Sequence, residues 1–200
     1  MILVVQEIFG VTGHIQRVAD QYAAAGYKAI APAMFDRLTR GITLDYKDVQ
    51  QGIAYMLELK WPNTLADVGA AAKELRSAGR VAIVGYCWGG TVAHVAAADL
   101  TFDAAISYYG GGVAKMLDKK PRCPILYHFG DQAADLLELL DAEAASRAGR
   151  RAEADAGGDE RLFRIVGDAV LVAGDRGAIE RLFGVLALGL LGAQVDQHQV

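Results

Sequence analysis

The feature that most constrains the fold is a glycine-flanked cysteine turn within residues 81–94, which read Val-Ala-Ile-Val-Gly-Tyr-Cys-Trp-Gly-Gly-Thr-Val-Ala-His. The apolar run before the turn predicts a buried strand, and the small residues after it predict a helix packed closely on a sheet. Gly85 and Gly89 lie two residues before and after Cys87, where side chains would collide in a sharp turn. A G-x-C-x-G turn between a strand and a helix is the pattern of a nucleophile elbow.

The turn places Cys87 at the N-terminus of the predicted helix. The partial positive charge there is expected to lower the pKa of the thiol and to favour the thiolate. The alternative is a structural cysteine beside a glycine-rich βα turn of a nucleotide-binding fold. Such a loop carries G-x-G-x-x-G or a Lys-Ser/Thr pair, and this turn has neither. The local pattern therefore favours a nucleophile.

Strand and helix patterns alternate along the first 131 residues. Strands are expected at 2–5, 27–31, 80–84, 103–108 and 124–129. Helices are expected at 14–26, 47–59, 61–77 and 91–98, the third with Asn63 or Thr64 as its N-cap. This order predicts an α/β fold in which a mostly parallel sheet carries helices on both faces.

Composition narrows the partners. The net charge of −4 and the pI of about 5.5 argue against nucleic acid or an anionic membrane as the main partner and favour a small-molecule substrate. The two cysteines are too few for a disulfide framework and predict free thiols in the cytoplasm. The start shows no signal peptide, and the apolar stretch 182–191 is shorter than the ~20 residues of a membrane span. The oligomeric state has no signal in the sequence.

Residue usage changes abruptly near residue 132. Pro, Lys, Thr, Tyr, Trp, Cys, Met and Asn together supply 34 of the first 131 residues and none of the last 69. Residues 1–131 are therefore expected to form the α/β core, and 132–200 an atypical tail rich in Ala, Gly, Leu, Arg and Asp. Helices at 135–155 and 177–191 and a strand at 168–173 are expected in the tail.

Five collinear segments carry a family resemblance. They are Val-Val-Gln-Glu-Ile-Phe-Gly-Val (4–11), Ala-Ile-Ala-Pro-Ala-Met-Phe (29–35), Gly-Tyr-Cys-Trp-Gly-Gly (85–90), Ser-Tyr-Tyr-Gly (107–110) and Pro-Ile-Leu-Tyr-His-Phe-Gly-Asp (124–131). In order and spacing this chain resembles the dienelactone hydrolase (carboxymethylenebutenolidase) family of the α/β-hydrolase superfamily, from residue 1 to about 132. The resemblance implies an α/β-hydrolase-like fold.

The resemblance also implies roles for individual residues. Cys87 is the nucleophile, and Glu7 is the carboxylate that accepts the thiol proton when substrate binds. The backbone N–H groups of Ile8 and Trp88 form the oxyanion hole, and Arg37 holds the substrate carboxylate. The family reaction opens an enol-lactone through an acyl-enzyme, releases a dicarboxylic product such as maleylacetate, and uses no metal or organic cofactor.

Physical reasoning supports part of this assignment. Glu7 follows a predicted buried strand and so lies at the carboxyl edge of the sheet, where sites of α/β proteins form. The alternative for Glu7 is an ordinary solvated loop carboxylate, and for Arg37 an ordinary surface-loop arginine.

The acid and base of a catalytic triad are not recognisable. The family pattern has an Asp three residues after the strand-ending glycine, where this chain has Ala133. Asp131 and Asp135 are offset from that position, and an offset of one or two residues redirects the side chain. The four histidines match no triad position: His14 begins a helix, His94 points away from Cys87, His128 lies within a strand, and His198 is near the C-terminus.

The resemblance begins at a central strand of the family and stops where the composition changes. We expect a truncated gene or a frameshift in GC-rich DNA as the origin of the tail, with a genuine alternative extension as the rival account. Two functions follow as hypotheses. The first is a lactone or ester hydrolase impaired by the missing triad residues, and the second is an inactive remnant or small-carboxylate-binding protein that retains the pocket.

Overall fold

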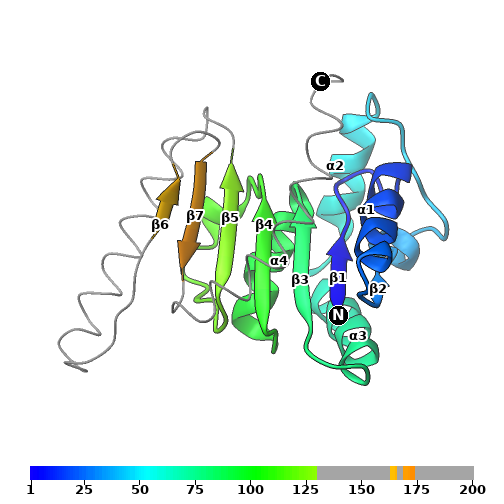
Figure 1. The fold of residues 1–200 in the computed structure, drawn as a ribbon. Helices are drawn as coiled ribbons and strands as arrows, with labels where there is room; N and C mark the ends of the chain where they lie inside the picture. The colour runs from blue at the N-terminus through cyan, green and yellow to red at the C-terminus, as the bar shows by residue number, and fades with distance from the viewer. Residues whose placement is uncertain (130–162, 166–168, 174–200) are drawn as a thin grey trace, which may run out of the picture.

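Five parallel strands form one side of the sheet in the computed structural model, which describes residues 1–129, 163–165 and 169–173. In spatial order they are β2 (Ala29–Ile30), β1 (Ile2–Val5), β3 (Ala82–Tyr86), β4 (Ala104–Tyr108) and β5 (Ile125–Phe129). All four neighbouring pairs are parallel, so their carboxyl ends meet at one edge (Figure 1). The expected α/β fold with a mostly parallel sheet is confirmed.

Helices cover both faces of this sheet. On one face, α1 (Gly13–Ala24) buries Ile15, Val18 and Tyr22 against alternate strand residues that include Ile2 and Val4. On the other face, α2 (Val49–Glu58), α3 (Trp61–Arg76) and α4 (Trp88–Asp99) pack against the intervening positions. Side chains of a strand point alternately to its two faces, so the wholly apolar β1 can contribute to both cores.

Helix α4 lies deepest. Its first ten residues are all buried, and most of them are small, which allows close approach to the sheet. The helix begins at Trp88 rather than at residue 91 as the sequence predicted, and β3 ends at Tyr86 rather than Val84. Cys87 alone therefore separates β3 from α4, and the turn is shorter than the bounds predicted from the sequence.

The predicted N-cap of α3 is wrong. The helix begins at Trp61, with Lys60 in the cap position and no side-chain hydrogen bond to the first turn. Pro62 fits this first turn because a backbone N–H is not needed there. Thr64, one of the two predicted caps, is instead buried inside the helix. Strand β2 is also shorter than the predicted strand 27–31.

Two antiparallel strands extend the sheet beyond β5. They are β7 (Ala169–Ala173), which pairs with β5, and β6 (Phe163–Ile165), which pairs with β7. The strand predicted at 168–173 is confirmed for 169–173, whereas β6 is too short for a sequence pattern to reveal. The helices predicted at 135–155 and 177–191 lie outside the described residues.

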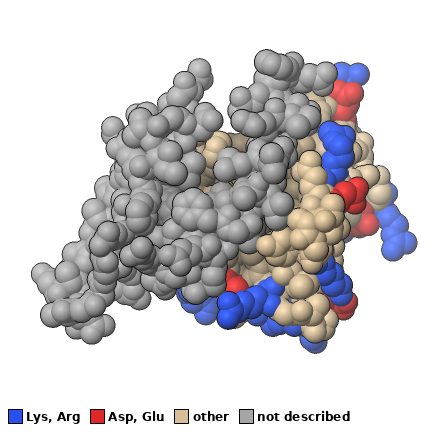
Figure 2. All heavy atoms as spheres, viewed as in Figure 1, with Lys and Arg blue, Asp and Glu red and all other residues tan. Residues whose placement is uncertain are grey.

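The surface of the described part carries charges of both signs. In Figure 2, spheres of Lys and Arg lie among those of Asp and Glu on the described part of the visible face. No helix among the described residues combines the length and the apolar character needed to cross a membrane.

Candidate active site

Cys87 lies on the turn between β3 and α4 with backbone angles of φ 55° and ψ −120°. A residue with a Cβ pays on the order of 1–3 kcal/mol for such a conformation. Hydrogen bonds hold the turn on both sides. The Cys87 N–H donates to the Tyr108 carbonyl oxygen at 3.0 Å, and the Cys87 carbonyl oxygen accepts from the Gly90 N–H at 2.9 Å. The strained conformation is thus imposed by β4 and α4 together.

The two glycines of the turn are required by contact with backbone atoms. A Cβ on Gly85 would overlap the Gly89 carbonyl group, and a Cβ on Gly89 would lie 2.5 Å from the carbonyl oxygens of both Val5 and Gln6. The steric prediction made from the sequence is therefore confirmed. The same contact brings the end of β1, and with it Glu7, next to the elbow.

Burial raises the pKa of the Cys87 thiol above its ordinary value, and the nearby Glu7 carboxylate adds to the rise. The Trp88 backbone N–H hydrogen-bonds the thiol and acts in the opposite direction. The expected lowering of the pKa by the helix N-terminus is therefore wrong in net direction, because desolvation of the thiolate outweighs it. At neutral pH the thiol of the free protein is protonated.

Glu7 is buried in the loop between β1 and α1, with 8% of its surface exposed. The Tyr46 hydroxyl donates to Glu7 Oε2 at 3.0 Å, and the Tyr109 hydroxyl donates to Oε1 at 3.4 Å. Burial and the Glu7 charge both raise the pKa of Tyr109, so that phenol remains a hydrogen-bond donor at neutral pH. Two phenols thus orient the carboxylate that lies beside Cys87.

Sequence reasoning missed both tyrosines. Tyr109 directly follows β4, so the physical argument that supported Glu7, a polar group close after a buried strand, could have found it. Tyr46 lies 39 residues from Glu7 in a loop, where its ring packs edge-on against Phe9 with centroids 4.7 Å apart. No local sequence pattern predicts the contact between Tyr46 and Glu7.

The side chain of Gln6 holds the loop that contains Glu7 and Ile8. The Gln6 side chain is fully buried. Gln6 Oε1 accepts the Met34 N–H at 3.0 Å, and Nε2 donates to the Glu7 carbonyl oxygen at 3.3 Å. Among the described residues, no backbone acceptor takes the Ile8 N–H. Ile8 lies in the loop after β1, and Trp88 is the first residue of α4, which meets the end of β1 at Gly89. The predicted oxyanion hole stays a prediction.

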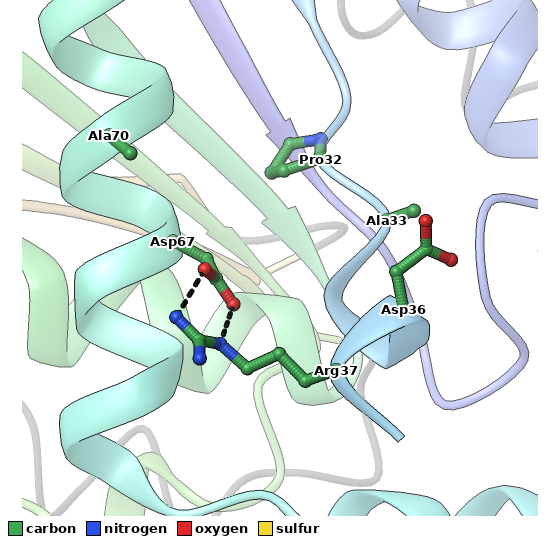
Figure 3. A pocket seen from close by; sticks show the side chains of 6 residues that line it. All are labelled: Pro32, Ala33, Asp36, Arg37, Asp67 and Ala70. Atoms are coloured by element: carbon green, nitrogen blue, oxygen red, sulfur yellow. Dashed lines mark hydrogen bonds and ion pairs between the residues drawn. The ribbon is translucent and has the colours of Figure 1, made fainter. Parts of the chain in front are cut away.

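Arg37 has a different partner. It ends the short 3-10 helix η1 (Met34–Arg37) and donates through Nε and Nη2 to the two carboxylate oxygens of Asp67 in α3, at 2.6 and 2.8 Å. These hydrogen bonds raise the pKa of the guanidinium further. Figure 3 shows the pair in an open hollow, also lined by Pro32, Ala33, Asp36 and Ala70. The predicted role of Arg37 in holding substrate stays a prediction.

His94 is engaged on both ring nitrogens. Its Nδ1 lies 2.6 Å from the Tyr127 hydroxyl oxygen, and its Nε2 lies 2.9 Å from the Met116 carbonyl oxygen. The ring is buried and links α4 to β5 and to the segment after η2 (Val113–Lys115). His94 is therefore occupied by structural contacts, in line with its predicted orientation away from Cys87.

The other triad candidates are only partly covered by the structure. His14 packs against Tyr86, and His128 packs against Tyr108. Asp131, Ala133, Asp135 and His198 lie outside the described residues. Within residues 1–129, 163–165 and 169–173, no cluster of three or more His, Cys, Asp or Glu side chains is arranged to hold a metal ion.

Comparison with known proteins identifies the family of the chain. The family model for the dienelactone hydrolase family matches residues 1–144, twelve residues beyond the limit of about 132 expected from the motifs. A carboxymethylenebutenolidase from Pseudomonas putida is 36% identical over 141 residues, which cover 66% of this chain and 60% of that protein. Carboxymethylenebutenolidase 1 from Cupriavidus pinatubonensis is 32% identical over 139 residues, or 65% of this chain and 59% of that protein.

A solved structure assigned to a dienelactone hydrolase of Klebsiella pneumoniae subsp. pneumoniae aligns with a TM-score of 0.49 and 33% identity, over 54% of this chain and 47% of that one. The chain thus spans about 60% of the length of the two curated relatives. The family model itself covers nearly three quarters of the chain and includes the elbow, the Glu7 loop and η1. This chain belongs to the dienelactone hydrolase family.

Proposed function

We propose that this chain is a cysteine-dependent hydrolase of lactones or related esters, built on an α/β-hydrolase-type core. The observation that carries the proposal is the strained Cys87 turn with the buried Glu7 carboxylate beside it. The relatives that are named carboxymethylenebutenolidase support a lactone as the substrate class. Because the chain spans about 60% of their length, the activity of the whole protein is part of this proposal.

The proposed reaction begins from a protonated thiol. Glu7 accepts the proton of the Cys87 thiol when substrate binds, and the sulfur attacks the carbonyl carbon of the lactone. The backbone N–H groups of Ile8 and Trp88 hydrogen-bond the oxyanion that develops. The intermediate collapses, the ring C–O bond breaks, and the leaving oxygen takes the proton back from Glu7. The product of this half-reaction is a thioester on Cys87.

In this proposal, Arg37 binds the carboxylate of the substrate. A guanidinium binds a carboxylate through two parallel hydrogen bonds, which also fixes its orientation. Arg37 lies on η1, two residues after Phe35, and the Phe35 ring stacks on Trp88 at a centroid distance of 5.9 Å. The helix that carries Arg37 therefore packs against the elbow, although the guanidinium itself is turned toward α3.

Release of the acyl group needs a base that activates water. His94 is engaged on both nitrogens, and the family position for the triad acid holds Ala133. We therefore propose that acylation of Cys87 proceeds and that deacylation is slow. The second candidate is a small-carboxylate-binding protein that retains the pocket; it stays a prediction, since the hollow at Arg37 is also lined by Asp36 and Asp67.

A reading-frame shift is our proposal for the origin of residues 132–200, because eight residue types vanish together at that point. The test is translation of the other two reading frames of the gene around codon 132. An Asp codon at the third position after Gly130 and a later Gly-His-Gly-Phe-like stretch in one of these frames would support the shift. If neither frame contains these features, the proposal is refuted.

The test of the hydrolase is a rapid-mixing experiment with p-nitrophenyl acetate. We expect a burst of about one p-nitrophenolate per chain, followed by slow turnover. Cys87→Ala should abolish the burst, and Cys123→Ala, which removes the other free cysteine, should retain it. A burst that survives Cys87→Ala contradicts the proposal. No burst, together with iodoacetamide labelling of Cys87 that a carboxylate ligand blocks, supports the binding protein instead.

A further inference from the structure

We propose that Tyr46 is a positioning residue for acylation: its hydroxyl holds the Glu7 carboxylate in the orientation that accepts the proton of Cys87. The inference rests on the proposed role of Glu7 and deepens it, because it names the residue on which the efficiency of the proton transfer depends. Tyr46 lies in the loop before α2, 39 residues from Glu7 in the sequence, and no motif of the chain pointed to it.

The Tyr46 hydroxyl makes the shorter of two hydrogen bonds to the Glu7 carboxylate. It donates to Oε2 at 3.0 Å, whereas the Tyr109 hydroxyl donates to Oε1 at 3.4 Å. Among the described residues, these two phenols are the side-chain donors to that carboxylate. Hydrogen bonds to a charged acceptor are strong when short and weaken as they lengthen. Tyr46 therefore fixes the direction of the carboxylate more than Tyr109 does.

The loop that carries Tyr46 is bound to the loop after β1. Gly10 forms an antiparallel bridge with Thr43, and the Leu44 N–H donates to the Phe9 carbonyl oxygen at 2.8 Å. The Tyr46 ring packs edge-on against the Phe9 ring. Backbone and ring contacts thus place the hydroxyl without help from the carboxylate, which is what an orienting group requires.

The environment of Glu7 makes one donor important. Glu7 is 8% exposed, whereas Tyr46 is 52% exposed. A buried carboxylate has little water around it, so protein donors decide how it is oriented. A phenol suits this purpose because it donates a hydrogen bond without carrying a charge. A cation in the same place would form an ion pair and would oppose transfer of the thiol proton to Glu7.

The Tyr46 phenol keeps its own proton throughout the reaction. The thiol proton passes from Cys87 Sγ to a Glu7 oxygen while the bond between sulfur and the substrate carbonyl carbon forms. The leaving oxygen takes that proton when the ring C–O bond breaks. Tyr46 gains and loses neither a proton nor an electron pair, so its contribution is geometric. Misplacing a base in this way slows the reaction by about tenfold or more.

The test measures the rate of the p-nitrophenolate burst in the full-length protein, by rapid mixing at a series of p-nitrophenyl acetate concentrations. Tyr46→Phe keeps the ring against Phe9 and removes the hydroxyl. It should slow the saturating burst rate about tenfold. The burst amplitude, which counts the active chains, should stay at about one per chain, and the half-saturating concentration should change by less than about twofold. Tyr109→Phe, which removes the longer hydrogen bond, should slow the burst only about two- to threefold.

Two further variants show whether Tyr46 acts through Glu7. Tyr27→Phe is the matched control, since it removes the same hydroxyl from a ring that packs against Tyr22; its burst rate should stay within about twofold of that of the unsubstituted protein. In a Glu7→Gln background, Tyr46→Phe should cause no further loss, because the amide cannot take the thiol proton. An equal loss in both backgrounds would show that Tyr46 supports the fold only, and would overturn the inference.

Glu7→Gln alone separates failure of the inference from failure of the proposed function. If Glu7→Gln leaves the burst rate unchanged, the proposed role of Glu7 fails, and the inference fails with it. If Glu7→Gln slows the burst but Tyr46→Phe does not, positioning by Tyr46 is refuted while the role of Glu7 stands. A change in the half-saturating concentration alone would also refute positioning, since Tyr46 would then contact the substrate. Absence of a burst in the unsubstituted protein refutes the hydrolase and the inference together.

Discussion

Replacing Cys87 with glycine should give a more stable protein than replacing it with alanine. Both variants lose the thiol, and they differ in the Cβ that is strained at φ 55° and ψ −120°. The strain amounts to about 1–3 kcal/mol. Glycine avoids it but loses about 0.5–1 kcal/mol through its greater freedom in the unfolded chain. The net advantage of Cys87→Gly is therefore about 1 kcal/mol, or about 2–4 °C in Tm for a chain of this length.

The comparison is made by thermal unfolding followed by circular dichroism, with urea unfolding as a second measure. The control is the same pair of substitutions at Cys123, which is not among the residues of positive φ. The Cys123→Gly variant should be less stable than the Cys123→Ala variant by about 0.5–1 kcal/mol. If glycine is the less stable substitution at both cysteines, the Cys87 turn is not strained, and the elbow assignment loses its physical basis.

Three further predictions concern the same region. Gly89→Ala should lower stability by about 1–3 kcal/mol in urea unfolding, because its Cβ meets carbonyl oxygens of the β1 end; unchanged stability would contradict the contact. Iodoacetamide labelling of Cys87 should reach its midpoint at a pH above that of an ordinary thiol, and Glu7→Gln should move the midpoint down, because it removes one cause of the raised pKa; an upward move would refute this. Tyr127→Phe should destabilise the protein by about 1 kcal/mol, because it removes the hydrogen bond between the Tyr127 hydroxyl and His94. Tyr108→Phe should not, because the buried Tyr108 hydroxyl has no hydrogen-bond partner among the described residues. Equal losses of Tm in the two variants would contradict both expectations.

Much of the central sheet could be predicted because its signals are local. The apolar run of β1 and the glycines around Cys87 act within a few residues, through burial and steric exclusion. The same locality explains the errors. The N-cap of α3 depends on where the helix docks, so two good capping residues, Asn63 and Thr64, fell inside the helix instead. Strand β6, three residues long, exists only by pairing with β7.

The candidate site residues were assigned from the family resemblance and stay predictions, whereas their contacts come from the structure. Glu7 was assigned in this way, and its place two residues after β1 agrees with the expected carboxyl edge of the sheet. Its partner Tyr46 comes from a loop 39 residues away, and Arg37 is joined to Asp67 across thirty residues. Sequence spacing cannot predict such pairs, because they depend on which loops the sheet brings to one edge.

The amino-acid sequence by itself determined the elbow. Glycines at positions 85 and 89 are needed wherever a strand turns so sharply into a helix, and Cys87 is the residue that such a turn presents. Only the tertiary structure decided the protonation state of that cysteine. A helix N-terminus lowers the pKa of a thiol, but the desolvation that opposes it comes from neighbours distant in sequence, and here desolvation prevails. The position of the candidate nucleophile is thus a local property of the chain, and the pKa of its thiol is a property of the fold.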